Sequence, residues 1–218
     1  MVTRVATVAF QGIEAVPVDV QVQITPGFPK FILVGLPDKA VNESGERVRA
    51  ALVASGLGLP PKRITVNLAP ADLPKEGSHY DLPIALGLMA ALGAIPSDAL
   101  DGYMAVGELG LDGRLAPTPG VLPAAIAAAA HDLGIICAEA AGPEAAWAGD
   151  DVEIIAPQSL LALCCGFLLL LLFGRVQGRI PMKAMVAAAL VWAVAAGMGR
   201  QRSYLAHRSH CRCHAHCR

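Results

Sequence analysis

Residues 67–87, NLAPADLPKEGSHYDLPIALG, contain the densest polar cluster of the chain and join two apolar segments. The run that enters this stretch, 63–69, predicts a strand that ends before Pro70, because proline has no N–H group to donate to a strand ladder. The nearly all-apolar run that leaves it, 81–94, predicts a buried helix. The stretch therefore predicts a strand, a charged loop and a helix in succession.

The segments on either side predict a mixed architecture. Upstream, the patterns predict strands at 4–10, 15–24 and 31–35 and a helix at 38–56. Downstream, they predict strands at 103–111 and 113–117, a helix at 120–133, and strands at 135–140 and 152–157 with a helix between them. Asp38 is the expected cap of the upstream helix and Gly56 its end, and Asp112-Gly113 is the expected turn of a downstream hairpin. Hairpins followed by alternating strands and helices indicate an α/β (mixed α+β) fold with helices packed on one mixed sheet.

Charge divides the 218 residues into two regions. Residues 1–163 contain nine Lys and Arg against all eighteen Asp and Glu, a net charge of −9, whereas residues 164–218 contain eight Lys and Arg and no acid. We therefore expect a folded domain over 1–163 and an unrelated apolar, basic, helical tail over 164–218. The start of the chain does not have the pattern of a signal peptide, and the lone Cys137 of the first region suits a reducing compartment, so the predicted location is cytoplasmic.

The loop at 72–81 has two interpretations. In the functional one, Ser78 and His79 lie near the amino end of a helix with Lys75 within reach, as in a nucleophile or anion site. In the structural one, Asp81 caps the helix, Gly77 supplies a turn and the charges are solvated. A nucleotide-binding phosphate loop is not expected, because the chain contains no Gly-Lys dipeptide.

Several long strings resemble the magnesium-chelatase-like AAA+ family, the ComM/YifB group. They include FILVGLPDKAVNESGERVRAAL, the 67–87 stretch and VGELGLDGRLAPTPGVLPAA, and the resemblance covers residues 1–163. It implies an amino-terminal domain of the ChlI type, similar to the proteolytic domain of Lon. The family-motif positions are Asn67, Pro70, Lys75, Glu76, Gly77, Asp81, Gly107, Glu108 and Gly113.

The resemblance also indicates that the Lon-type Ser–Lys dyad is missing. A Lon-like loop PKDGPSAG, laid on PKEGSHYD, puts the serine position on His79, and the lysine position falls on Leu122. Leucine cannot accept a hydroxyl proton, so no catalytic residue is expected. Ser78 with Lys75 remains a weak candidate pair for a Ser-dependent peptidase.

The family resemblance implies a function for the whole. Full-length members resemble hexameric DNA-remodelling ATPases linked to branch migration and natural transformation, which use ATP and Mg. The expectation is therefore a non-catalytic accessory domain, truncated before its ATPase module, with DNA and AAA+ subunits as partners and no cofactor or metal of its own. A local DNA patch of Arg47, Arg49, Lys62 and Arg63 is one option, and a solvated surface is the other.

The tail has three interpretations. Apolar runs at 158–173 and 184–199 suggest a membrane hairpin, and a membrane-anchored fragment is then the alternative function with the membrane as partner. A second is a zinc site from His210, Cys211, Cys213, His214, His216 and Cys217, whose spacing is too tight for a structural site. The third is a change of reading frame, which fits the loss of acids and of the family pattern after Leu163.

Overall fold

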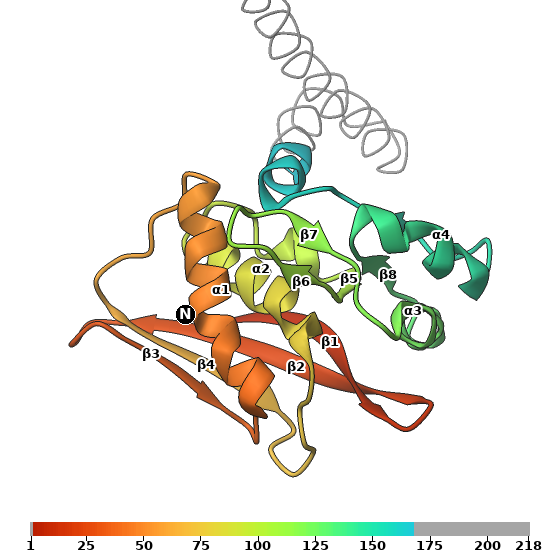
Figure 1. Ribbon diagram of the computed structural model, residues 1–218, viewed down its shortest axis with the longest axis horizontal. Coiled ribbons are helices and arrows are strands. Elements are labelled where there is room, and N and C mark those ends of the chain that lie inside the picture. The colour runs from red at the N-terminus through yellow and green to blue at the C-terminus, as the bar shows by residue number, and fades with distance from the viewer. Residues whose placement is uncertain (1, 168–218) are drawn as a thin grey trace, which may run out of the picture.

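The computed structural model describes residues 2–167 as one mixed sheet with helices on both faces (Figure 1). The seven strands lie in the order β3-β4-β2-β1-β5-β8-β9, and a separate hairpin contains β6 and β7. The strands are β1 (Val2–Gln11), β2 (Glu14–Thr25), β3 (Lys30–Val34), β4 (Arg63–Ala69), β5 (Tyr103–Ala105), β6 (Glu108–Leu109), β7 (Leu115–Ala116), β8 (Gly134–Ile136) and β9 (Ile154–Ile155). The helices are α1 (Lys39–Ala54), α2 (Asp81–Ala91), α3 (Val121–Ala130) and α4 (Gly142–Ala145), with short 3₁₀ turns η1 (Ser78–Tyr80), η2 (Asp98–Leu100), η3 (Glu139–Ala141) and η4 (Ala146–Ala148).

The predicted amino-terminal half is confirmed. β1 and β2 pair antiparallel from Val2↔Gln23 to Gln11↔Glu14, and β4 pairs antiparallel with β2 and ends at Ala69, directly before proline. β3 and β4 run parallel, with α1 as their crossover. Gly35 makes this crossover feasible, because its φ is +105° and a Cβ there would meet the Leu68 carbonyl oxygen at 2.2 Å.

Helices α1 and α2 cover one face of β1–β4, which we call the covered face (Figure 1). Asp38 caps α1 as predicted, since its carboxylate accepts a bond from the Val41 N–H at 2.7 Å. α2 is apolar on all sides and is buried between the sheet, α1 and the β6 hairpin. Close approach of α2 to the sheet depends on Gly87, where a Cβ would lie 2.7 Å from a methyl group of Val22.

The second half differs from the prediction in the extent of its strands, since those expected at 135–140 and 152–157 are only β8, of three residues, and β9, of two. The predicted hairpin of 103–111 with 113–117 is wrong in its extent, because Tyr103–Ala105 joins the main sheet as β5 and only β6 and β7 form the hairpin. β5, β8 and β9 are parallel neighbours, as the alternating strands and helices require. α3 packs on the opposite face from α2, against Val8 and Phe10 of β1.

The face of β2, β3 and β4 opposite α1 and α2 is uncovered over much of its area, and we call it the open face. Its side chains alternate with the buried valines and leucines of the same strands. It consists of Gln21, Gln23 and Thr25 of β2, Lys30, Ile32 and Val34 of β3, and Arg63, Thr65 and Asn67 of β4. All of these side chains are exposed or half-buried.

The folded core extends past the expected domain end. Residues 160–167 are helical, and Leu160, Leu163 and Phe167 are buried in the main core. Among residues 2–167, no helix has the length and apolar character needed to cross a membrane. The rest of the predicted apolar tail, including the 184–199 run and the His/Cys cluster after 209, lies outside the described residues.

Candidate functional site

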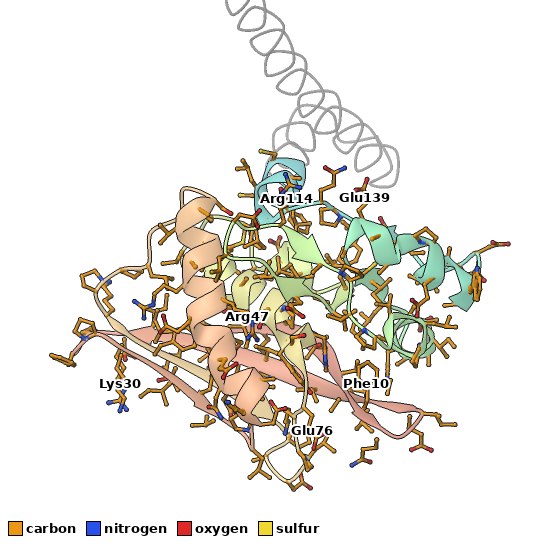
Figure 2. The ribbon with its side chains drawn as sticks, viewed as in Figure 1. Phe10, Lys30, Arg47, Glu76, Arg114 and Glu139 are labelled. Carbon is orange, nitrogen blue, oxygen red and sulfur yellow. The ribbon has the colours of Figure 1, made fainter. Side chains whose placement is uncertain are left out.

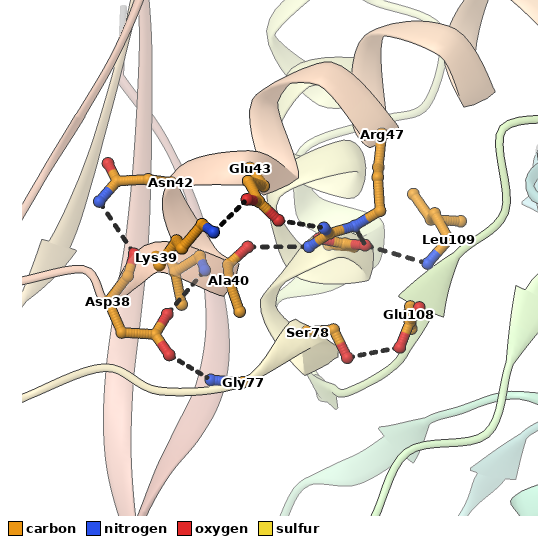
Figure 3. Close-up of polar contacts among 12 residues, drawn as sticks. Asp38, Lys39, Ala40, Asn42, Glu43, Arg47, Gly77, Ser78, Glu108 and Leu109 are labelled. Carbon is orange, nitrogen blue, oxygen red and sulfur yellow. Dashed lines mark hydrogen bonds and ion pairs between the residues drawn. The ribbon is translucent and has the colours of Figure 1, made fainter.

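The polar loop of 70–80 is tied to the segment that joins β3 to α1. The Lys75 N–H donates to the Leu36 carbonyl at 3.1 Å, and the Asp38 N–H donates to the Lys75 carbonyl at 2.9 Å. The second carboxylate oxygen of Asp38 accepts from the Gly77 N–H at 3.3 Å (Figure 3). Asp38 therefore serves both as the cap of α1 and as an anchor for the loop, and Gly77, with φ +97°, supplies the predicted turn.

Asp81 makes a two-pronged ion pair with Arg47 of α1 (Figure 3). Arg47 Nε lies 2.6 Å and Nη2 lies 2.9 Å from the two carboxylate oxygens, and the Leu109 N–H donates to Asp81 at 3.2 Å. Asp81 is fully buried, whereas the Arg47 side chain is 21% exposed. The pair therefore joins α1, α2 and β6 at one point.

The prediction that Asp81 caps the helix in solvent is wrong, because Asp81 is the first residue of α2 and its carboxylate contacts Arg47 and Leu109 instead. Burial raises the pKa of Asp81, although the bonds from Arg47 and the Leu109 N–H oppose that rise. The bond to Asp81 raises the pKa of Arg47.

Lys75 and Ser78 have separate partners. The Lys75 side chain is buried and its ammonium donates to the Pro70 carbonyl, and burial lowers the pKa of this amine. The Ser78 hydroxyl donates to the Glu108 carboxylate at 2.5 Å (Figure 3). The two side chains of the candidate pair are thus hydrogen-bonded to different residues, Lys75 to Pro70 and Ser78 to Glu108, and not to each other.

His79, at the position aligned with the Lon-type serine, is buried beside Phe10, with ring centroids 5.0 Å apart. Its Nε2 lies 2.9 Å from the Val8 carbonyl oxygen, and burial lowers the pKa of the imidazole. A neutral imidazole that donates to this carbonyl explains the contact. His79 therefore anchors the loop to β1.

The other family-motif positions are distributed around this loop. Gly107 links it to β6, since its N–H donates to the His79 carbonyl at 3.0 Å and its carbonyl accepts from Leu82 at 3.0 Å. Gly113 accepts from the Leu160 N–H at 2.9 Å, and Glu76 is exposed. Asn67 is apart from them, because it lies on the open face and donates to Gln21 at 3.1 Å.

The fold separates the four residues of the predicted DNA patch, Arg47, Arg49, Lys62 and Arg63. Arg47 is paired with Asp81 on the covered side, and Arg49 lies on the exposed surface of α1. Lys62 and Arg63 lie at the start of β4, with Arg63 on the open face. Sequence reasoning missed the Arg47–Asp81 and Ser78–Glu108 pairs, and no local pattern could have identified them, because their members are 34 and 30 residues apart.

No group of three or more His, Cys, Asp and Glu residues within 2–167 is placed to hold a metal ion. Cys137, the predicted core thiol, is buried on β8's carboxyl side, and burial raises its pKa to about 11, so the thiol is neutral near pH 7. The polar cluster around Asp81 contains the residues that the sequence singled out, and it is the candidate site.

Comparisons with known proteins agree with the sequence resemblance. A family model described as subunit ChlI of Mg-chelatase matches residues 20–141. YifB from Escherichia coli is 47% identical over 135 residues, covering 62% of this chain and 27% of that protein. The competence protein ComM from Haemophilus influenzae is 44% identical over 153 residues, covering 70% of this chain and 30% of that protein.

The chain thus spans less than a third of the length of these relatives. The family model covers more than half of the chain, and it includes the loop, Arg47, Asp81 and Glu108. The chain belongs to the magnesium-chelatase-like ComM/YifB family and contains its ChlI-type amino-terminal domain.

Proposed function

We propose that this domain is a non-catalytic accessory domain of a magnesium-chelatase-like AAA+ protein that remodels DNA. The observation that supports it most is the separation of the candidate dyad: the Lys75 ammonium is bonded to Pro70 and the Ser78 hydroxyl to Glu108. A serine nucleophile needs a base within hydrogen-bond reach, and a buried amine bonded to a carbonyl does not meet that need. The domain's residues hold its elements together instead.

The partners in this proposal are DNA and neighbouring AAA+ subunits, and ATP and Mg are bound by an ATPase module that these residues do not contain. One relative of this chain is named a competence protein, which supports the link to natural transformation that the sequence resemblance implies. The sequence has no Gly-Lys phosphate loop, which supports the absence of nucleotide binding by this domain. A cytoplasmic location is part of the same proposal.

The runner-up is a Ser-dependent peptidase. One observation favours it: Ser78 is only half-buried, begins the turn that leads into α2, and contacts a carboxylate. A fluorophosphonate probe separates the two functions, with the exposed Ser97 as a control serine. Labelling at Ser78 that disappears in Ser78→Ala and persists in Ser97→Ala would establish the peptidase and contradict the accessory role. The membrane-anchored alternative predicts that carbonate washing leaves the chain on membranes.

A chimera tests the accessory function directly. The matched 153 residues of Haemophilus influenzae ComM are replaced by those of this chain, and transformation frequency is measured in cells that lack ComM. We expect the chimera to restore transformation and its Ser78→Ala version to do so equally well. A chimera that accumulates normally but fails to restore transformation would overturn the proposal.

A further inference from the structure

Two cations, Lys30 and Arg63, lie at one end of the open face, next to the turn that joins β2 to β3, and a third, Lys62, lies beside them where β4 begins. Lys30 and Arg63 are direct neighbours across the parallel β3–β4 pair, and Arg63 is also opposite Thr25 of β2. Lys62 precedes Arg63 in the chain. We call Lys30, Lys62 and Arg63 the basic patch, and Figure 2 shows Lys30 projecting from the sheet on the side away from α1.

These cations have no carboxylate partner. Among the residues that the structure describes, no Asp or Glu oxygen lies within 4.0 Å of any of the three. Arg4, the other cation on this side of the sheet, contacts Asp19 at 3.6 Å and is therefore not part of the patch. Charge that is left unpaired is available to an anion from outside the molecule.

The local sequence keeps acids away from the patch. Residues 20–37 and 47–71 contain no Asp or Glu, although residues 1–163 as a whole carry a net charge of −9. The two acid-free segments pair with each other in the sheet through β2, β3 and β4. The fold thus brings these three cations together in a part of an acidic domain whose nearby sequence contains no acid.

An exposed aromatic ring lies beside the patch. Phe28, in the turn between β2 and β3, is 87% exposed. The same turn packs on the patch, because a Cβ at Gly27 would lie 3.9 Å from Arg63 Cβ. Prolines on both sides of this turn, Pro26 and Pro29, restrict its backbone. The exposed ring therefore belongs to a turn that contacts Arg63 and leads directly into Lys30.

We propose that the basic patch and Phe28 bind single-stranded DNA. Cations that follow a phosphodiester backbone, next to an aromatic ring on which an unpaired base stacks, are the usual elements of sequence-tolerant single-strand binding. Gln23 and Thr65 continue the open face beyond the cations with amide and hydroxyl groups. This inference rests on the proposed function, because it names the surface that contacts DNA there.

Two other partners fit the surface less well. Duplex DNA supplies the phosphates, but its bases are stacked and leave Phe28 without a role. An anionic membrane supplies negative charge, but Phe28 is the one strongly exposed large apolar side chain that the structure describes beside the cations. Gln23 and Thr65, which continue the face, are polar, and the exposed Val34 lies at the other end of β3. A single strand uses the cations, the ring and the polar groups together.

The test measures binding of a fluorescein-labelled twenty-nucleotide oligo(dT) by anisotropy, using the full 218-residue chain. The patch variant is Lys30→Gln/Lys62→Gln/Arg63→Gln. Its control is Lys39→Gln/Arg49→Gln/Arg114→Gln, which removes the same charge from exposed positions elsewhere. Both variants keep residues 164–218, so any binding by that basic segment is common to them.

We expect the patch variant to bind about a hundredfold more weakly than the control near 0.1 M salt, and its salt slope to fall by about 2, because three phosphate contacts are lost. Phe28→Ala should weaken binding by about tenfold, through loss of stacking, whereas Trp147→Ala, which removes another ring that is 80% exposed, should not. Circular dichroism and urea midpoints equal to those of the unchanged chain establish that the variants are folded.

Three outcomes would overturn the inference. The patch and control variants could bind oligo(dT) with equal affinity, or duplex DNA could compete for the chain as strongly as unlabelled oligo(dT). In the third, Phe28→Ala would weaken binding to anionic vesicles but leave binding to oligo(dT) unchanged. None of these outcomes contradicts the proposed function, which is tested by the transformation frequency of cells that carry the ComM chimera. Conversely, if the patch binds oligo(dT) but the chimera does not restore transformation, the DNA-binding surface stands and the accessory role is rejected.

Discussion

Arg47 and Arg63 lie on opposite sides of the same sheet and have opposite surroundings. Arg47, under the covered side, is bonded to the buried Asp81 and fixes α1 to α2 (Figure 3). Arg63, on the open face, has no carboxylate within 4.0 Å among residues 2–167. The role of a cation here depends on the side of the sheet on which it lies: a cation packed between the helices on the covered side stabilises the fold, whereas a strand cation on the open face is free to bind a partner in the binding that we propose.

The largest expected effect is on the covered side. Asp81→Ala leaves the partly buried Arg47 and the Leu109 N–H without their acceptor, so the free energy of unfolding should fall by about 3 kcal/mol. Urea denaturation measures it. The control, Glu43→Ala, removes an exposed partner of Arg47 and should cost less than about 1 kcal/mol. Equal losses in the two variants would show that burial does not distinguish these carboxylates.

The next effect depends on pH and concerns His79. Burial lowers the pKa of His79 in the folded chain below the ordinary 6.5. As the pH falls through 6.5, this imidazole therefore takes up a proton in the unfolded chain while it stays neutral in the folded chain. Stability should therefore decrease as the pH falls from about 6.5 towards the folded pKa, by at most about 1.4 kcal/mol for each pH unit. Urea midpoints across this range measure the decrease.

The matched variants for this pH effect are His79→Gln and His131→Gln, and His131 is exposed. The pH-dependent loss should disappear in the first and persist in the second. If His79→Gln still shows the full pH-dependent decrease in stability, the decrease comes from other titratable groups and not from the buried imidazole of His79.

A smaller effect is expected at the loop. Ser78→Ala removes the donor to Glu108 and should lower the free energy of unfolding by about 1 kcal/mol, because a part-buried hydrogen bond is lost. Thermal and urea denaturation measure this change. Ser97→Ala is the matched control at an exposed site. If Ser78→Ala does not lower the free energy of unfolding, the bond to Glu108 does not stabilise the fold, and the nucleophilic role of Ser78 is then the one to test.

The smallest effect is expected on the open face. The triple patch variant should change the free energy of unfolding by less than about 0.5 kcal/mol, because its cations have no intramolecular partner to lose. Urea denaturation beside the unchanged chain measures this. A loss as large as that of Asp81→Ala would mean that the basic patch is part of the stabilising framework, and the division between the two faces would fail.

Local patterns predicted much of the fold. The alternation in 15–24, the cap at Asp38 and the end of a strand before Pro70 were all confirmed, since each depends on neighbours in the chain. The downstream hairpin was assigned too many residues because Tyr103–Ala105 has the same alternating pattern whether it pairs locally or joins the main sheet. The Lon-type identity of the fold stays a prediction.

The site was predictable only in part. The sequence identified the polar loop and named Lys75, Ser78 and Asp81. The structural interpretation of that loop treated its charges as solvated, whereas Lys75 and Asp81 are buried. Burial of a charge depends on partners distant in the chain, and Arg47 and Glu108 belong to other elements. The basic patch was also predicted only in part. The sequence grouped Lys62 and Arg63 with Arg47 and Arg49, and it did not include Lys30, which only strand pairing brings beside Arg63.

The sequence by itself determined the order of the elements, the cap of α1, the end of β4 before Pro70, and the concentration of acids outside 20–37 and 47–71. These features follow from backbone periodicity, capping and composition, which act over a few residues. Only the tertiary structure decided that Asp81 pairs with Arg47 and that Lys30 lies beside Arg63. Strand order and register bring such residues together, and both are set by packing of the whole core rather than by any local stretch.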